Sequence, residues 1–329
     1  MRRREFIALL GGGAAAWPLP ALAQASDRMR RIGVLSPFAE NDPDTRANET
    51  AFRQALEKLG WTDGRNIHID SRWGGGNAER IHAQAIELVD LKPDVLVVST
   101  ALVLQPLRQA AGDIPIVFTQ ITDPVGSGFV ASLARPGGSI TGFTPAEFSI
   151  YGKSLEVLKE LAPAVTRAAV ILNPDQSPQM GMWSAIEAAA PRLGVKVTAS
   201  PVRDAADLAP AIDALARAPK GGLVVLPSPI TQVNRKLIIT AAARHRLPAI
   251  YAFRHFVQDG GLVSYGIDLA DQYRQAALYV DRILRGEKPA ELPVQQSTKF
   301  ELVINVKTAK ALGLEVPLQL QQRADEVIE

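Results

Sequence analysis

The chain has 329 residues, of which 36 are lysine or arginine and 34 are aspartate or glutamate. No basic run with interleaved aromatic residues occurs, so nucleic acid is not expected as a partner. Cysteine is absent, which excludes a disulfide framework, a thiolate metal site and a lipid-bearing cysteine. With 47% hydrophobic residues, the chain can bury a large core that we expect to divide into two domains.

Residues 1–23 have the pattern of an export signal. The segment MRRREFIALLGGGAAAWPLPALA combines a basic start, a short apolar stretch and small residues at Ala21 and Ala23. Arg3 and Arg4 have the spacing of the twin-arginine route, and a Sec signal is the alternative. We expect cleavage after Ala23 and an unanchored, periplasmic product. Cleavage removes three basic residues and one acidic residue, leaving 33 of each and a net charge of zero.

From Arg31 onward, short β-branched runs alternate with helical patterns. The first half reads as strand RIGVLS, a helix through TAFRQALEKLG, strand NIHIDSRW, a helix through AERIHAQAIELVDL, strand DVLVVST, a helix through LQPLRQAAG and strand PIVFTQ. The alternation of helices and strands begins again after Gly152, with strands RAAVILN, VKVTASPV, GLVVLP and PAIYAF separated by helices. Repeated β-α-β units predict parallel sheets covered by helices on both faces, so the fold class is α/β with two doubly wound lobes.

The carboxyl ends of the predicted strands are the places to look for a ligand site, because open parallel sheets bind ligands there. The residues at these ends are mostly small and polar, and their hydroxyls and the free amides of helix starts suit a carboxylate. Taken singly, each is better explained as a helix cap, so the prediction rests on the set. The candidates are Ser36, Phe38, Thr100, Ala101, Thr122, Asp123, Asn173 and Ser228.

Motifs for catalysis or metal binding are missing from the sequence. No H-E-x-x-H spacing, G-x-S-x-G elbow or P-loop occurs. The glycines of WGGGNAER precede a helix, but Glu79 stands where a dinucleotide motif has its third glycine, which favours a tight turn. We therefore expect no catalytic residue, no metal and no cofactor, and a protein that is not an enzyme. The scattered histidines are His68, His82, His245 and His255.

Long segments of the chain resemble one family. IPIVFTQITDPVGSGFVASLARPGGSITG, GKSLEVLKELAPAVTRAAVILNP, SYGIDLADQYRQAALYVDRILRGEKPAELPVQQSTKFELVINVKTAKALGLEVP and the terminal RADEVIE are similar to ABC transporter substrate-binding proteins of the tryptophan/tyrosine-binding type. The resemblance covers essentially the whole chain after the signal. It implies a type I periplasmic binding fold, in which two α/β lobes joined by a three-segment hinge close on a small ligand. It also implies a membrane permease as partner. We expect this protein to be a monomer, since it must present both lobes to the permease.

The resemblance and the rhythm of elements together predict the extent of each lobe. The N-terminal lobe is expected to comprise residues 27–143 and about 266–290, and the C-terminal lobe residues 144–265 and about 291–329. Three glycines near the first of these boundaries, Gly137, Gly138 and Gly142, are candidates to absorb backbone rotation when the lobes close.

Two aspartates are candidate partners of a ligand ammonium or hydroxyl. Asp123 follows a strand and precedes Pro124, so it can cap a helix through GSGFVASLA or face the cleft. Asp268 also stands where a strand runs into a helix, and its alternative role is the N-cap of that helix. An aromatic side chain can stack on a planar ligand or simply pack in the core. The aromatic candidates are Phe38, Phe143, Tyr151, Trp183 and Tyr265.

The family resemblance implies an aromatic amino acid as ligand, but one turn departs from the family pattern. Where family members have T-P-A after the third strand, this chain reads STALVLQP, and Leu102 and Val103 favour a bulkier or more apolar carboxylate such as an aromatic acid. We expect capture of a small carboxylate-bearing ligand for ABC import. The alternatives are a sensory module that feeds a membrane receptor and, less favoured, a secreted α/β enzyme.

Overall fold

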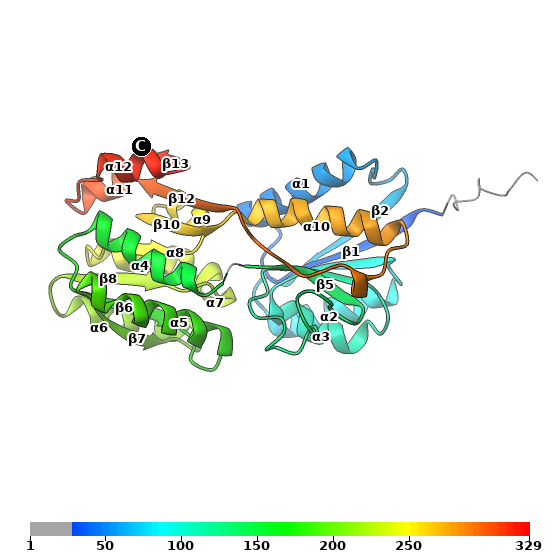
Figure 1. The fold of residues 1–329 in the computed structure, drawn as a ribbon, viewed down its shortest axis with the longest axis horizontal. Helices are drawn as coiled ribbons and strands as arrows, with labels where there is room; N and C mark the ends of the chain where they lie inside the picture. The colour runs from blue at the N-terminus through cyan, green and yellow to red at the C-terminus, as the bar shows by residue number, and fades with distance from the viewer. Residues whose placement is uncertain (1–27, 146) are drawn as a thin grey trace, which may run out of the picture.

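The computed structural model describes residues 28–145 and 147–329 and places them in two lobes joined by several crossing segments (Figure 1). Each lobe holds one sheet with helices on both faces, as the sequence predicts. The export signal expected at residues 1–23 lies outside the described residues. Within the described part of the chain, no helix combines the length and apolar character that crossing a membrane requires.

The first lobe is built on a six-stranded parallel sheet with the strand order β11-β5-β4-β3-β1-β2. Helices α1 and α10 pack against each other on one face of the sheet, and α2 and α3 cover the other face. The strands are β1 (Arg30–Ser36), β2 (Ile67–Trp73), β3 (Val95–Ser99), β4 (Ile116–Thr119), β5 (Ile140–Thr144) and β11 (Gln295–Gln296). The helices are α1 (Pro43–Lys58), α2 (Ala78–Asp90), α3 (Ala101–Ala110), α10 (Leu269–Leu284) and the 3-10 turn η3 (Pro289–Glu291).

The second lobe is built on a seven-stranded sheet with the order β13-β12-β10-β9-β8-β6-β7. It departs from an all-parallel sheet at one pair, since β12 arrives from the first lobe and runs antiparallel to β10. The strands are β6 (Arg167–Leu172), β7 (Lys196–Pro201), β8 (Gly221–Val225), β9 (Ala249–Tyr251), β10 (Val263–Ile267), β12 (Phe300–Asn305) and β13 (Glu326–Ile328). The helices are α4 (Ser149–Leu161), α5 (Ser177–Ala189), α6 (Leu208–Ala216), α7 (Pro229–Val233), α8 (Arg235–Arg244), α9 (Arg254–Gln258), α11 (Val306–Ala311) and α12 (Leu318–Arg323), with 3-10 turns η1 (Pro191–Leu193) and η2 (Ala205–Asp207).

The chain passes between the lobes three times, after β5, between β10 and α10, and between β11 and β12. The third passage lies later than the boundary expected near residue 290. Leu292 and Val294 are buried in the two cores of the first lobe, and β11 pairs with β5, so residues 291–296 belong to that lobe. Burial of these two apolar side chains keeps the segment on the first lobe until residue 297.

Gly142 does not lie in a hinge. It is inside β5, where a Cβ would come within 2.1 Å of the carbonyl oxygen of Phe118 on the neighbouring β4. Glycine is needed there because the two strands approach closely, and the backbone is fixed by strand pairing rather than free to rotate.

The helix expected after Pro124 does not form. The Asp123 carboxylate accepts a hydrogen bond from the Gly126 amide at 2.8 Å, and the Ser127 amide donates to the Asp123 carbonyl at 3.0 Å, which closes a single turn. Gly128 then has a φ of 69°, in the left-handed region, so the right-handed turn ends at once.

Gly266 in β10 provides a test of close backbone packing at the boundary between the lobes. A Cβ at this position would lie 1.8 Å from the carbonyl oxygen of Ala252, at the end of β9. We expect Gly266→Ala to lower the free energy of unfolding by about 1–3 kcal/mol, the usual effect of overpacking, and to lower the melting temperature. Gly138→Ala is the control, since its Cβ would meet nothing within 4 Å. Equal melting temperatures for the two variants would contradict this packing.

Candidate functional site

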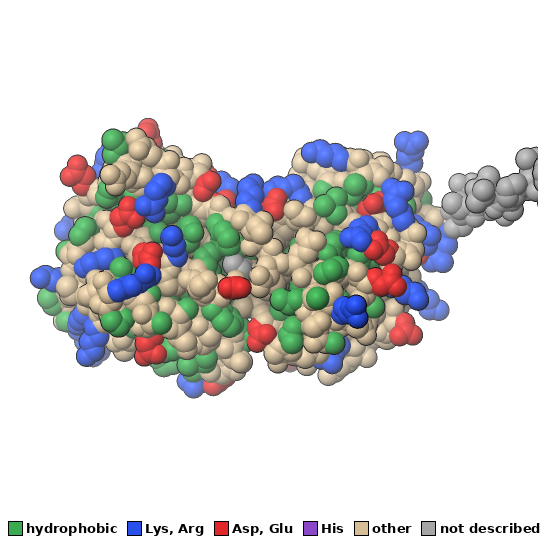
Figure 2. Space-filling view, in the orientation of Figure 1, with side chains coloured by type: hydrophobic (Ala, Val, Ile, Leu, Met, Phe, Trp, Pro, Cys, Tyr) green, Lys and Arg blue, Asp and Glu red, His purple; other side chains and the backbone are tan. Residues whose placement is uncertain are grey.

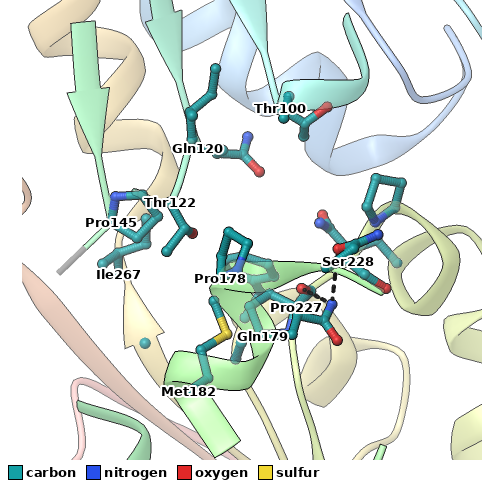
Figure 3. Close-up of a pocket in the computed structure, with 18 of the residues that line it drawn as sticks. Thr100, Gln120, Thr122, Pro145, Pro178, Gln179, Met182, Pro227, Ser228 and Ile267 are labelled. Atoms are coloured by element: carbon teal, nitrogen blue, oxygen red, sulfur yellow. Dashed lines mark hydrogen bonds between the residues drawn. The ribbon is translucent and has the colours of Figure 1, made fainter. Parts of the chain in front are cut away.

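A cavity of about 310 Å³ lies between the lobes, at the carboxyl ends of strands from both sheets (Figure 3). In the space-filling view the lobes meet along a groove, with basic and acidic side chains mixed over both (Figure 2). The first lobe contributes the segments after β3 and β4, namely Thr100, Ala101, Leu102, Gln120, Ile121, Thr122 and Ser127. Pro145, after β5, and the second lobe supply the rest of the wall, namely Ile150, Tyr151, Gln176, Pro178, Gln179, Met182, Pro227, Ser228, Pro229, Gln232, Ala252, Phe253, Tyr265, Gly266 and Ile267.

The structure brings half of the candidate residues from the sequence to this cavity. Thr100, Ala101, Thr122, Ser228 and Tyr265 line it. The other half do not line it, and their side chains have local roles. These residues are Ser36, Phe38, Asp123, Asn173 and Asp268.

The two strand ends of the first lobe carry unusual backbone. Thr100 and Gln120 have φ angles of 68° and 58°, which non-glycine residues rarely adopt. Among the described residues, Thr100 Oγ1 and Gln120 Oε1 are buried without a hydrogen-bond partner. Strained backbone and unsatisfied polar atoms in one cavity wall are typical of a site completed by a ligand.

Gln120 is held in place by a buried glutamine of α10. The backbone amide of Gln120 donates to Gln272 Oε1 at 3.1 Å, and Gln272 Nε2 donates to Ser297 Oγ at 2.7 Å. Gln272 is 2% exposed, so this side chain fastens the cavity wall to the third passage between the lobes. A ligand that moves Gln120 therefore acts directly on a connecting segment.

The polar residues of the second lobe are largely occupied by their own helix starts. Ser228 caps α7, since its Oγ accepts from the Thr231 amide at 3.1 Å and its amide donates to Thr231 Oγ1 at 3.0 Å. Gln179 Nε2 donates to the Pro227 carbonyl at 3.1 Å, one of the contacts drawn in Figure 3. Asn173 accepts from the Asp175 amide at 3.0 Å, which makes a local turn beside the cavity.

The two candidate aspartates serve as caps. Asp123 binds the Gly126 amide, as described above, and borders a different pocket near β5. Asp268 is the N-cap of α10, accepting from the Asp271 amide at 3.0 Å, from Lys299 Nζ at 2.8 Å and from Arg274 at 3.1 Å. Burial alone would raise the pKa of Asp268, but the hydrogen bond from Lys299 and the other donors hold it below its usual value. Its carboxylate is therefore ionised and fully engaged.

The aromatic candidates divide between cavity and core. Tyr151 and Tyr265 line the cavity, joined by Phe253, which the sequence did not single out. Phe143 packs in the first lobe with its ring centroid 4.8 Å from that of Tyr279. Trp183 packs against the core of the second lobe.

A small polar pocket adjoins the cavity and shares Gln120 and Gln232 with it. Phe38 lines this pocket, and Ser36 lies just before it, with its Oγ accepting from the Phe38 amide at 3.3 Å. Its ionisable side chains come from both lobes. They are Asp42, Asp44, Arg235 and His255.

Arg235 of α8 joins the lobes across this pocket. It binds Asp42 of the first lobe at 2.7 Å, lies 3.7 Å from Asp44 and binds Asp259 of its own lobe at 2.7 Å. The side chains of Arg235 and Asp42 are only 12% and 16% exposed, so water screens this pair weakly. The contact stabilises the observed approach of the lobes.

Burial controls protonation around Arg235. Burial, with the nearby charge of Asp42, raises the pKa of Asp44 to about 6. Burial and the charge of Arg235 lower the pKa of His255 to about 4, so its ring is neutral at pH 7. The 3.5 Å approach of His255 Nδ1 to Asp44 is therefore a polar contact rather than an ion pair. Arg235 is thus the cation that joins the lobes in this pocket at neutral pH.

Sequence reasoning missed Gln120, Gln232, Met182 and Phe253 among the cavity residues. Gln120 directly follows β4, so the strand-end rule could have found it. Gln232 and Met182 sit within helices of the second lobe, and the sequence carries no signal that separates them from ordinary buried positions. Among the described residues, no group of three or more His, Cys, Asp or Glu side chains could hold a metal ion.

Two α/β lobes with a cavity between the carboxyl ends of their strands define a type I periplasmic binding protein fold. The chain belongs to the ABC transporter substrate binding protein family, whose model matches residues 32–328. This confirms the resemblance seen in the sequence, and it places the chain in a family of solute-binding proteins.

Three known proteins illustrate the relationship. The chain is 27% identical over 291 residues to a tyrosine-binding protein of Clostridioides difficile, covering 88% of this chain and 83% of the relative. It is similar to a conserved domain protein of Vibrio cholerae, with a TM-score of 0.83, 28% identity and coverage of 91% and 100% of the two chains. A Streptococcus pneumoniae ABC domain in complex with L-Trp shares the fold, with a TM-score of 0.84, 24% identity and coverage of 92% and 100%.

The contact of Arg235 with Asp42 predicts a measurable effect on lobe closure. Arg235→Ala leaves Asp42 without its cation, and breaking a buried pair costs the closed arrangement about 3–5 kcal/mol. We expect a larger radius of gyration by small-angle X-ray scattering for the ligand-free variant. Arg72→Ala is the control, because it breaks an ion pair with Glu87 that lies within the first lobe. An unchanged scattering profile for Arg235→Ala would show that this pair does not hold the lobes together.

Proposed function

We propose that this protein is the periplasmic solute-binding component of an ABC import system. It captures a small carboxylate-bearing ligand, an aromatic amino acid or an aromatic acid, between its lobes and delivers it to a membrane permease. Membership of the substrate-binding family supports the transport role, and the signal pattern of residues 1–23 supports export. The observation that carries the proposal is a cavity lined from both lobes, with a hydroxyl at a helix start that has no hydrogen-bond partner in the described part of the chain.

The carboxylate is assigned to the start of α3. Thr100 is the N-cap of this ten-residue helix but makes no capping bond, and its Oγ1 has no partner among the described residues. The first amides of a helix have no intrahelical acceptor, and Ala101 and Leu102 stand in this turn at the cavity wall. The hydroxyl, the two amides and the helix dipole together suit an anionic oxygen.

The body of the ligand is assigned to the apolar part of the wall. Tyr151, Met182, Phe253 and Ile267 line the cavity from the second lobe. A volume of about 310 Å³ is in the range of small-molecule sites, which start at about 300 Å³. An aromatic ring buried here gains contact area and, against Tyr151 or Phe253, a favourable ring arrangement.

Capture works through closure and requires no bond chemistry. A ligand held at α3 of the first lobe and on the apolar wall of the second lobe makes its full set of contacts only when the lobes approach. These contacts, absent in an open state, are what shift the population toward the closed form that a permease recognises. The relatives named for tyrosine and L-Trp support an aromatic ligand for this chain as well.

Thr100→Val tests the carboxylate site by titration calorimetry on the chain from Gln24 onward, against aromatic amino acids and aromatic acids. Loss of a hydrogen bond to a charged group costs about 1.5–3 kcal/mol, so we expect affinity to fall by about 10- to 150-fold. The melting temperature of the ligand-free variant should not fall, because Thr100 Oγ1 has no hydrogen bond to lose with any described residue.

The control is Thr141→Val, also buried in the first lobe but with its Oγ1 donating to the Leu292 carbonyl at 2.6 Å. It should lose stability and keep ligand affinity. Undiminished affinity in Thr100→Val would remove the carboxylate from the start of α3. Failure of every aromatic amino acid and aromatic acid to bind the unmodified chain would overturn the proposed ligand.

A further inference from the structure

We propose that this cavity selects organic acids that lack an amino group, and that it discriminates against the corresponding α-amino acids. The inference rests on the proposed function and specifies the chemical class of its ligand. It separates this chain from the relatives whose names refer to tyrosine and L-Trp.

The charge of the cavity wall is the first observation. Every described residue that lines the cavity has an uncharged side chain, and none is Asp, Glu, Lys, Arg or His. An α-amino acid brings a carboxylate and an ammonium into the same enclosed space. The carboxylate of the ligand can bind at the start of α3, but no described residue of the wall supplies a carboxylate to pair with the ammonium. An ionised group buried without a counter-charge is strongly unfavourable.

The acidic residues around the cavity are occupied by other partners. Asp123 binds the Gly126 amide and borders another pocket, and Asp268 is held by Lys299, Arg274 and its own helix start. Both carboxylates therefore already bind protein donors, and neither lines the cavity.

The remaining acids, Asp42 and Asp44, line the adjoining pocket rather than the cavity. Gln120 and Gln232 belong to both walls and separate the two spaces with neutral amides. Asp42 is paired with Arg235 at 2.7 Å, and the same arginine lies 3.7 Å from Asp44. Both acids therefore already have a protein cation beside them, with which a ligand ammonium would have to compete.

The helices around the cavity also favour an anion over an ammonium. α3 from the first lobe and α5 from the second both begin at the cavity wall, with Thr100 and Gln176 as their N-cap residues. The N-terminal end of a helix carries partial positive charge, which attracts an anion and repels an ammonium. The unpartnered Thr100 Oγ1, in a residue only 7% exposed, marks the start of α3 as the anion site.

Gln120 Oε1 adds a neutral acceptor to this wall. It is buried without a partner among the described residues, so the ligand is expected to bring a donor to it. A hydroxyl or amide of the ligand satisfies a neutral acceptor without leaving net charge in the cavity. A hydroxylated or heteroaromatic acid fits this pattern.

The experiment compares matched pairs that differ only in the amino group. L-Tyrosine is paired with 3-(4-hydroxyphenyl)propanoate, L-tryptophan with 3-(indol-3-yl)propanoate and L-phenylalanine with 3-phenylpropanoate. Titration calorimetry at pH 7 is expected to show that, in each pair with a compound that binds, the amine-free acid binds at least tenfold more tightly than the amino acid. Equal or tighter binding of the amino acid would overturn the inference while leaving the proposed function in place.

A variant reverses the electrostatics of the wall. Gln120→Glu places a carboxylate beside the ligand. It is expected to lower the affinity for the amine-free acid at least tenfold. The ratio of the affinities for the acid and for its matched amino acid should therefore fall or be reversed. Gln54→Glu, on the exposed face of α1, adds the same charge away from the cavity and should change neither affinity. An unchanged preference in Gln120→Glu would also overturn the inference. If no compound of any pair binds the unmodified chain, the proposed ligand class and this inference fall together.

Discussion

The meeting of strand ends from two parallel sheets is the constraint on which the site depends. Each sheet presents the starts of its helices at one edge, and the three passages of the chain hold these edges against each other. The start of α3 and the residues after β4 therefore face α5 and α7 across one cavity. Backbone amides and hydroxyls gather there, and no described residue of the wall has a charged side chain, which supports the proposed binding of an anionic group in an apolar setting.

The ligand space and the contact between the lobes are physically continuous. Gln120 stands in the cavity wall and in the adjoining pocket, and its amide is fixed by Gln272, which also binds the third passage at Ser297. Next to it, Arg235 pairs with Asp42 across the gap. The cavity wall and the contact between the lobes therefore share the same few side chains. This is the arrangement that the proposed capture by lobe closure requires.

The sequence predicted the two lobes because hydrophobic periodicity and β-α-β order are local signals, and the strand-end rule brought Thr100 and Ser228 to the cavity. It could not decide the direction of Asp123 or Asp268, since both depend on whether an amide three residues later is free to be capped. The third passage was placed too early, because burial of Leu292 and Val294 against the first lobe is a tertiary effect. The role of Gln120 likewise depends on a backbone conformation that no sequence pattern showed.

The most direct test of the central claim is the distance between the lobes with and without ligand. The lobes come close to each other at Gly76 and Val233, since a Cβ added to Gly76 would lie 3.4 Å from a methyl group of Val233. The chain contains no cysteine, so spin labels can be placed on Glu79→Cys and Lys236→Cys, two exposed positions beside this contact. Pulsed electron paramagnetic resonance measures the distance between the two labels. We expect this distance to become shorter when an aromatic acid or aromatic amino acid that binds is added. The same distance at saturating ligand would contradict capture by lobe closure.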